Sequence, residues 1–370
     1  MKLVYFTHSL ASCWNHGNAH FLRGLLREMV RRGHAVAAFE PAHGWSRCNL
    51  IADQGAEALR QSESCYGGVD LHVYDCQSAA EELVVDADVV IVHEWTDPQL
   101  VAELGRLRAR SAKFVLLFHD THHRAVSDPE AMGQFDLSAY DGILAFGASL
   151  ADAHERLARG PRVFVFHEAA DTHQFAPPIP ATDDRRFGAV WIGNWGDEER
   201  SAEIVTYLLR PAKRCHVALD VYGVRYPPEA QRILVEHGAS YRGWIANARV
   251  PSIFARHLMT VHVPRRFYTT VLPGIPTIRV FEALACGIPL ISAPWEDCEW
   301  LFRPGEDYLV AHTENEMCSL MREVANDGDL RQSLVCHGLE RIHARHTCSH
   351  RADELLAIIK QLQQQTVGVA

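Results

Sequence analysis

Three apolar runs in the first half of the sequence end in polar side chains that could do chemistry. Thr7-His8 follows the first run, His93-Glu94 the second and His119-Asp120 the third. If these runs are parallel strands, their carboxyl ends lie along one sheet edge, where ligands usually bind. His119 and Asp120 are therefore candidate catalytic residues. His122 and His123 are close to them in sequence and could equally bind an acceptor or act as the base.

The loop formed by residues 12–20 leaves the first expected strand and enters a helix. Backbone N–H groups at a helix start attract anions, and glycine lets a ligand approach the backbone closely. Gly17 and Asn18 are therefore candidate donor-binding residues, although a simple connecting loop explains the pattern equally well. The loop lacks the G-x-G-x-x-G pattern of a dinucleotide site, which disfavours a redox enzyme.

A second glycine-containing loop, residues 192–200, has the same strand-to-helix setting in the second half. Gly193 and Asn194 are candidate donor-binding residues, and Arg200 could bind a diphosphate through its guanidinium. The acidic residues 197–199 suit a first helical turn, so Arg200 could instead pair with one of them. Gly223, which follows the next expected strand, is a further donor-binding candidate.

The most informative segment is residues 272–292. Gly274 and the following proline predict a tight turn beside a helix start, which would place the backbone around Ile275 and Thr277 near a phosphate. Glu282 lies within that helix, where its carboxylate could accept hydrogen bonds from two ribose hydroxyls, although it could also be an exposed position of an amphipathic helix. Gly287 then ends the helix.

Arg265 and Arg266 follow another expected strand, shortly before the Gly274 turn. Two guanidinium groups there could neutralise a departing diphosphate. An exposed basic turn is the alternative. We list Arg200, Arg265 and Arg266 with His119 and Asp120 as the candidate catalytic set.

The elements that position these residues alternate between apolar strands and amphipathic helices, which predicts α/β domains with parallel sheets. We expect strands at 2–7, 35–39, 89–93, 114–119, 142–146, 163–166, 187–192, 217–222, 258–263 and 289–292, and helices at 19–32, 98–110, 200–209, 228–237, 277–286 and 349–365.

Length and composition favour two globular domains. The 370 residues exceed what one core usually organises, and we expect an N-terminal domain at 1–172, a proline-containing linker at 173–185, a second domain at 186–348, and a C-terminal helix with a tail at 349–370. The formal net charge of −10 disfavours nucleic acid as a partner. No apolar run is long enough to span a membrane, and the ten scattered cysteines suit reduced thiols, so we expect a cytoplasmic protein.

Residues 279–292, from Arg279 through Glu282 to Ser292, resemble the signature of group 1 glycosyltransferases, and more narrowly of their CgeB-like branch. Segments 15–20, 32–34, 118–120, 167–177 and 303–307 resemble the same family in the same order, so that the resemblance covers nearly the whole chain. It implies a GT-B fold, in which two Rossmann-like, doubly wound domains face a central cleft, with the N-terminal domain on the acceptor side and the C-terminal domain binding the nucleotide sugar. The chain departs from the family at Gly274, where many members have a second glutamate.

The resemblance implies a hexosyltransferase-type enzyme that moves a sugar from a nucleoside diphosphate sugar, with a UDP-sugar as the expected donor, to an unidentified acceptor with retention. Glu282 would bind the ribose, Arg200 the diphosphate, and His119 would lie near the donor sugar. We expect no metal and no cofactor beyond this co-substrate, and a homodimer remains an option. A nucleotide-sugar epimerase, or a catalytically silent nucleotide-sugar-binding protein, are the alternatives.

Overall fold

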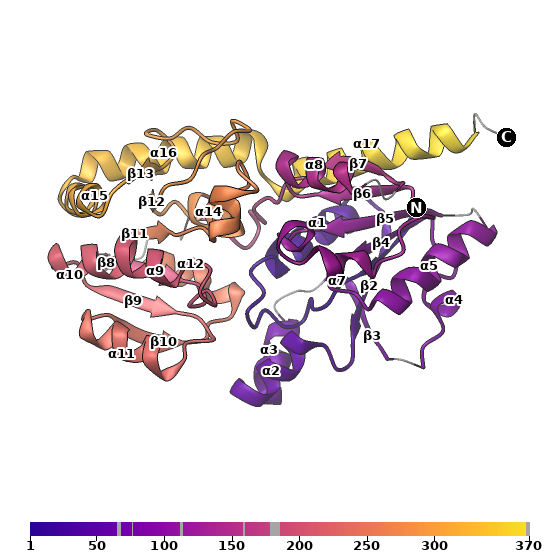
Figure 1. Ribbon diagram of the computed structural model, residues 1–370, viewed down its shortest axis with the longest axis horizontal. Helices are drawn as coiled ribbons and strands as arrows, with labels where there is room; N and C mark the ends of the chain where they lie inside the picture. Colours follow the sequence, from indigo (N-terminus) through magenta and orange to yellow (C-terminus); the bar gives the residue numbers. More distant parts are fainter. Residues whose placement is uncertain (65–67, 76, 112–113, 158–159, 178–185, 368–370) are drawn as a thin grey trace. The chain divides into compact units, whose positions relative to one another are not determined.

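The structure, a computed structural model, contains two compact units, Met1–Ala169 with Cys348–Ala370, and Ala170–Thr347 (Figure 1). It describes all residues except 65–67, 76, 112–113, 158–159, 178–185 and 368–370. The C-terminal helix, which we expected as a separate element, therefore belongs with the first unit. Most of the expected linker at 173–185 lies outside the described residues.

Unit 1 is built on a seven-stranded parallel sheet with the strand order β3-β2-β1-β4-β5-β6-β7. The central strands β1, β4 and β5 are buried along nearly their whole length, as expected for parallel strands covered by helices on both faces. The strands are β1 Lys2–Phe6, β2 Ala35–Pro41, β3 Asp70–Tyr74, β4 Val89–His93, β5 Val115–Asp120, β6 Gly142–Ala145 and β7 Arg162–Val165.

The helices of unit 1 connect successive strands, and the last helix of the chain packs against the first. Arg32, just after α1, donates to the Ser349 carbonyl at 2.8 Å and pairs with Asp353 on α17, which explains why the C-terminal helix belongs here. The helices are α1 Ala19–Arg31, α2 Trp45–Gln54, α3 Ala56–Ser64, α4 Ala80–Leu83, α5 Pro98–Ser111, α6 Arg124–Ser127, α7 Pro129–Gly133, α8 Ala148–Arg156 and α17 Cys348–Val367.

Unit 2 repeats this architecture with a six-stranded parallel sheet in the order β10-β9-β8-β11-β12-β13. One large core lies between this sheet and the helices that follow its strands, and it includes Trp191, Leu208, Val221 and Met317. The strands are β8 Phe187–Ile192, β9 Leu219–Tyr222, β10 Ser240–Gly243, β11 His257–His262, β12 Leu290–Ser292 and β13 Leu309–Val310.

The helix after β8 runs further than the sequence predicts. We expected it to end at Leu209, but helical structure continues to Arg214. The segment Val205–Leu209 is a π-helix, and this wider turn accommodates Pro211, which has no N–H to donate. The helical elements are α9 Ser201–Ile204, η1 Val205–Leu209, α10 Arg210–Arg214, α11 Pro228–Glu236, η2 Asn247–Arg249, α12 Val250–Phe254, α13 Arg266–Thr270, α14 Ile278–Ala285, α15 Glu314–Asn326 and α16 Gly328–Arg345.

Each sheet has a point at which the strand order reverses. In unit 1 the reversal falls between β1 and β4, and in unit 2 between β8 and β11. Helices after the flanking strands leave toward opposite faces at such a point, so a crevice opens beyond the carboxyl ends of the strands. The candidate residues that follow β1 and β4, and those that follow β8 and β11, lie at these two points.

The turn between α15 and α16 offers a test of helix capping. The Asp327 carboxylate accepts a hydrogen bond from the Leu330 N–H at 2.9 Å, and so satisfies one of the unpaired donors at the start of α16. We predict that Asp327→Ala lowers the free energy of unfolding by about 1 kcal/mol. Urea denaturation would measure this, with Glu323→Ala as the control because Glu323 lies near the same turn but its side chain does not cap α16. Equal stability of both variants would contradict the capping role.

Candidate functional site

The loop after β8 is fixed by hydrogen bonds to the end of β9 and to the loop that follows β9. The Gly193 N–H donates to the Tyr222 carbonyl at 2.9 Å, and the Tyr226 hydroxyl donates to the Gly193 carbonyl at 2.9 Å. The Trp191 indole N–H in turn donates to the Tyr226 hydroxyl at 2.9 Å. Trp191, Asn194 and Tyr226 are buried, and these hydrogen bonds hold the loop that carries Asn194 in one position.

Two expected donor-site glycines, Gly193 and Gly223, approach each other closely. A Cβ on Gly223 would lie 2.0 Å from the Gly193 carbonyl oxygen, and Gly223 has a φ of +148°. Only glycine fits a backbone contact of this kind. These glycines therefore shape the backbone at the point where the strand order of unit 2 reverses, and this role does not depend on which ligand binds.

Arg200 lies under the same loop, with its guanidinium largely enclosed. It donates to the Asn194 side-chain oxygen at 2.7 Å, to the Asn194 carbonyl at 3.2 Å and to the Val263 carbonyl at 3.3 Å, and it lies 5.1 Å from the centre of the Trp191 ring. Within the described part of the chain, no carboxylate lies within 4.0 Å of it. Burial, and the positive charges of Arg265 and Arg279, lower the pKa of Arg200 to about 9. An enclosed cation without a carboxylate is suited to bind an anionic ligand.

Arg265 and Arg266, which are neighbours in sequence, have different side-chain partners. Arg265 pairs with Glu199 and lies 3.4 Å from the Asn194 side-chain oxygen, so that it shares Asn194 with Arg200. Arg266 is half exposed and donates to Glu203 at 2.7 Å. Arg265 therefore lies at the crevice beside Arg200, whereas Arg266 is bound to the helix segment α9.

The turn before α14 contains the next three candidates. Gly274 has a φ of +87° and donates its N–H to the Glu296 carbonyl at 3.0 Å. Ile275 is buried, and Thr277 is the residue before the first turn of α14. A Cβ on Gly274 would lie 3.4 Å from Cγ and 3.5 Å from Oε1 of Glu299. The Glu299 side chain therefore occupies the space next to Gly274 where a longer residue at 274 would project.

Glu282 on α14 is completely buried and pairs with Arg279, one turn earlier on the same helix. A buried carboxylate costs free energy unless a cation or hydrogen bonds compensate it, and Arg279 supplies that compensation. Glu282 is the expected ribose-binding residue, whereas Arg279 was not among the predicted site residues. The Arg279 charge also acts on Arg200 and His262, so these residues share one electrostatic environment.

His262 at the end of β11 is a buried polar residue that the sequence analysis did not single out. The Ser292 hydroxyl donates to the Ala293 carbonyl at 2.7 Å, so it must accept from Nδ1–H of His262 at 2.9 Å. Nε2 then carries a lone pair, and it has no hydrogen-bond partner among the described residues. Burial and the charges of Arg200 and Arg279 lower the pKa of His262 to about 3.

In unit 1, four imidazoles gather at the carboxyl edge of the sheet. Ring centroids of His8 and His16 are 3.9 Å apart, those of His8 and His93 5.6 Å, and those of His93 and His119 5.8 Å. His119 is fully buried, with Nδ1 hydrogen-bonded to the Tyr5 hydroxyl at 2.5 Å. Burial lowers the pKa of all four, to about 3 for His8 and about 4 for His119. These imidazoles are therefore neutral at pH 7.

The acidic neighbours of His119 are paired with other side chains. Asp120 is fully buried and lies 2.7 Å from His154 Nε2. Glu94 pairs with Arg124 at 2.7 Å, while burial and the nearby Asp120 raise the pKa of Glu94 to about 8. The Asp120 carboxylate is therefore already engaged by a histidine in the core, His154.

The remaining unit 1 candidates lie in the loop before α1 and after β5. The Asn18 amide donates to the Thr121 hydroxyl at 3.0 Å, which links the two loops, and the Gly17 carbonyl contacts His20 at 3.2 Å. His123 contacts Ser127 at 2.8 Å. Gly17 and Asn18 thus belong to unit 1, while the other donor-binding candidates belong to unit 2. No result tests the roles expected for the individual residues, which stay predictions.

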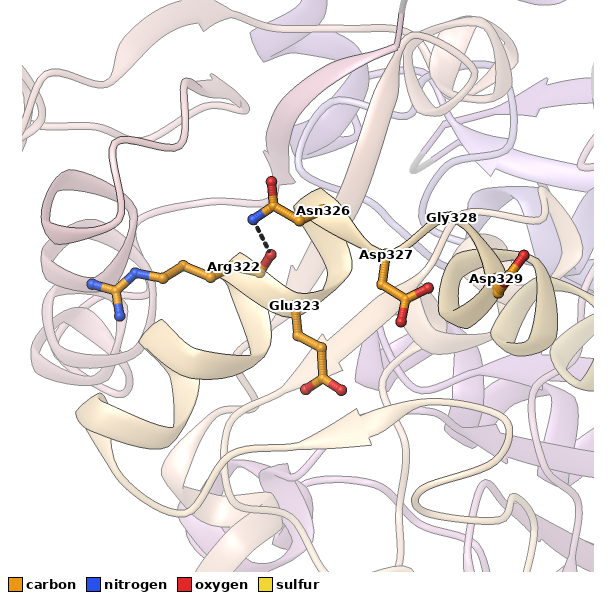
Figure 2. A pocket seen from close by; sticks show the side chains of 6 residues that line it. All are labelled: Arg322, Glu323, Asn326, Asp327, Gly328 and Asp329. Carbon is orange, nitrogen blue, oxygen red and sulfur yellow. Dashed lines mark hydrogen bonds between the residues drawn. The ribbon is translucent and has the colours of Figure 1, made fainter.

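An open pocket of about 610 Å³ lies elsewhere, at the turn between α15 and α16 (Figure 2). Its lining is polar and mostly exposed, and Figure 2 shows the side chains of Asp327 and Glu323 without any residue of the sites above. We assign it no function. In the described part of the chain, no group of three or more His, Cys, Asp or Glu residues is arranged to hold a metal ion. A separate survey of the described helices finds none both long and apolar enough to cross a membrane.

Comparisons with known proteins identify the fold. Residues 200–357 match the "Glycosyl transferase-like" family model. Sucrose-phosphate synthase from Thermosynechococcus elongatus is 15% identical, with 100% of both chains covered and a TM-score of 0.64. Anabaena HepE in complex with UDP and glucose is 13% identical, with 98% of this chain and 100% of HepE covered and a TM-score of 0.67. The chain has the GT-B fold.

An α-glucosyltransferase in complex with UDP and a 13-mer DNA is also similar, at 11% identity and a TM-score of 0.67, with 97% of this chain and 98% of that chain covered. No curated protein sequence matches the chain. The GT-B fold confirms the expected fold class of two doubly wound domains. The CgeB-like branch is narrower than these matches and stays a prediction.

The contact between Gly223 and Gly193 can be tested by adding one methyl group. We predict that Gly223→Ala lowers the free energy of unfolding by about 2–4 kcal/mol, because the new Cβ meets a backbone carbonyl and the backbone angle is unfavourable for alanine. The control is Gly238→Ala, which has a φ of +74° but no heavy atom within 4 Å of its Cβ, and should lose only about 1 kcal/mol. Urea denaturation measures both, and similar losses would argue against the close contact.

The neutral state of His262 predicts a specific pH dependence. The unfolded chain takes up a proton at this residue below pH 6.5, whereas the folded chain does so only near pH 3, so stability falls as the pH drops below 6.5. Between pH 7.5 and 5.0, His262 should account for a loss of about 2 kcal/mol.

The matched variant is His262→Asn, whose amide N–H can replace the donor to Ser292 but does not titrate. Denaturation at both pH values should show a smaller pH-dependent loss in the variant, by about 2 kcal/mol. The other histidines are common to both proteins and cancel. An identical pH dependence of wild type and variant would show that His262 is not held neutral.

Proposed function

We propose that this protein is a glycosyltransferase that transfers a sugar from a nucleoside diphosphate sugar, with a UDP-sugar as the preferred donor, to an acceptor hydroxyl. The family match and the GT-B fold support an enzyme of this type. The similar HepE and α-glucosyltransferase structures contain UDP, which supports UDP as the nucleotide here. The observation that carries the proposal is the enclosed Arg200, which has no carboxylate partner among the described residues and shares Asn194 with Arg265.

In this proposal unit 2 binds the donor. Glu282, paired with Arg279, accepts hydrogen bonds from the ribose hydroxyls. Arg200 and Arg265 bind the diphosphate, and the backbone of the Gly274 turn lies at the start of α14, where N–H groups favour phosphate. The Glu299 carboxylate lies next to Gly274, so it can supply a sugar contact that a side chain at 274 does not.

The reaction breaks the bond between the anomeric carbon and the β-phosphate oxygen, and the electron pair leaves with the nucleoside diphosphate. Arg200 and Arg265 stabilise the negative charge that develops on that oxygen. The acceptor oxygen forms the new bond to the anomeric carbon and loses its proton. His119, with a pKa of about 4, is a weak base at neutral pH. This supports transfer with retention, in which the departing phosphate oxygen takes the proton.

The donor site is tested by thermal unfolding in the presence of UDP, GDP, ADP and UDP-glucose. A ligand at 100 times its dissociation constant should stabilise the protein by about 2.7 kcal/mol. We expect this from UDP and UDP-glucose, and we expect Arg200→Met and Glu282→Gln to lose most of it. Arg322→Met is the control, because Arg322 lies in the α15–α16 pocket on the same unit.

The ligand-free melting temperature of each variant shows whether it is folded. Stabilisation by none of the nucleotides, or equal stabilisation of wild type and Arg200→Met, would contradict the donor site. Release of UDP from UDP-glucose that depends on an added acceptor would separate transfer from the alternatives. A nucleotide-sugar epimerase would instead convert the donor without an acceptor, and a silent binding protein would leave it unchanged.

A further inference from the structure

The loop between β8 and α9, residues 193–200, places a carboxylate against the arginines of unit 2. Glu199 pairs with Arg265. Arg265 in turn lies 3.4 Å from the Asn194 side-chain oxygen, which also accepts a hydrogen bond from Arg200 at 2.7 Å. Glu199 is therefore bound to one of the two guanidinium groups that the proposed function assigns to the diphosphate.

The two guanidinium groups that share the Asn194 side chain repel each other, and an anion placed against them relieves that repulsion. The effect is evident at Arg200, whose pKa is lowered by burial and then by the charge of Arg265, while the charge of Glu199 acts in the opposite direction. The Glu199 carboxylate therefore has the same electrostatic role as the phosphate oxygens of the proposed donor.

The backbone of the same loop is held in a conformation that its side chains disfavour. Gly196, Asp197 and Glu198 have consecutive φ angles of +98°, +49° and +66°. Left-handed backbone is unfavourable for residues that carry a Cβ, and it persists only where surrounding contacts impose it. Breaking those contacts releases strain, so it costs less free energy than it would in a relaxed loop.

Ion pairs on two sides hold this loop in place. Asp197 pairs at 2.9 Å with Arg225, in the loop after β9, and Glu199 pairs with Arg265, which follows β11. The Arg266 N–H also donates to the Glu199 carbonyl at 3.0 Å. The position of the loop therefore depends in part on whether the Glu199 carboxylate stays on Arg265.

Both members of the Glu199–Arg265 pair are accessible to solvent. The side chain of Arg265 is 17% exposed and that of Glu199 is 27% exposed. An ion pair in contact with water is weak, because water competes for both partners, so the pair can exchange. A diphosphate carries more negative charge than a carboxylate and can bind an arginine through two oxygens at once, which makes it the stronger partner.

We propose that Glu199 competes with the nucleoside diphosphate for Arg265 and so regulates the affinity of the donor site. Arg265 exchanges the carboxylate for phosphate oxygens when a diphosphate binds, and takes the carboxylate back as the nucleoside diphosphate product leaves. No covalent bond changes and no proton moves in this exchange. The inference rests on the proposed function, which assigns the diphosphate to Arg200 and Arg265, and it adds a residue that opposes binding at that site.

The test is isothermal titration calorimetry of UDP with the full chain. Glu199→Gln keeps the shape of the side chain but removes its charge. We expect it to tighten UDP binding about fivefold, the factor that corresponds to an ion pair of about 1 kcal/mol. The matched control is Glu203→Gln, which removes the same charge from a pair with Arg266 and should change the UDP affinity by less than about twofold.

A double-mutant cycle separates competition for Arg265 from a general change in charge. Arg265→Met should weaken UDP binding, and Glu199→Gln should bring no further gain in that background, because the arginine for which it competes is gone. A general effect of charge would tighten UDP binding equally in both backgrounds. Melting temperatures show that each variant is folded, and the comparison of Glu199→Gln with Glu203→Gln does not depend on Arg265→Met.

Three results would overturn the inference while the wild type binds UDP. Glu199→Gln could leave the UDP affinity unchanged or weaken it, which would assign Glu199 a structural role. Glu203→Gln could tighten UDP binding as much as Glu199→Gln does, or Glu199→Gln could act equally with and without Arg265. A different result, the absence of UDP binding by the wild type and by every variant, would contradict the proposed function itself, and the inference with it.

Discussion

The enclosed guanidinium of Arg200 is the constraint on which the candidate donor site depends. Removing a cation from water is costly, and here two carbonyls, the Asn194 side chain and the Trp191 ring replace the water. The surrounding backbone fits this side chain closely, because a Cβ on Gly196 would lie 2.3 Å from Arg200 Cγ. Glycine is required there for a packing reason, and in the part of the chain that the structure describes no carboxylate pairs with the guanidinium.

The parts of the fold that the sequence predicts best are those in which burial dictates the pattern. The apolar runs in β4 and β8 predict strands with the observed bounds, 89–93 and 187–192. The edge strands β3 and β10 are partly exposed and lack such a run, so they gave no comparable signal. The helix expected at 200–209 continues to Arg214 through a π-helical segment. Tertiary packing, and not the local sequence alone, therefore determines where this helix ends.

The candidate site was predictable only where the relevant residues are close in sequence. Arg279 and Glu282 are one helical turn apart, so their pairing could have been read from the sequence. Glu299 lies beside Gly274 through the fold of a loop 25 residues later, and nothing local indicates that contact. His8 and His93 come together only because β1 pairs with β4 across the reversal of strand order. Contacts of this kind follow from topology, which spacing alone does not specify.

The two sheet edges differ in their electrostatics, and this difference bears on how a transfer reaction would divide its tasks. In unit 2, burial and the charges of Arg265 and Arg279 lower the pKa of Arg200, and burial and the charges of Arg200 and Arg279 lower that of His262, so this edge favours binding of an anion. In unit 1, burial keeps four histidines neutral, so that edge can hydrogen-bond hydroxyls without attracting the donor's phosphates. In the proposed transfer, the positively charged edge of unit 2 would suit the anionic leaving group, and the uncharged edge of unit 1 would suit the neutral nucleophile. If the proposed transfer proceeds with retention, the acceptor proton goes to the oxygen of the departing phosphate, where the negative charge develops.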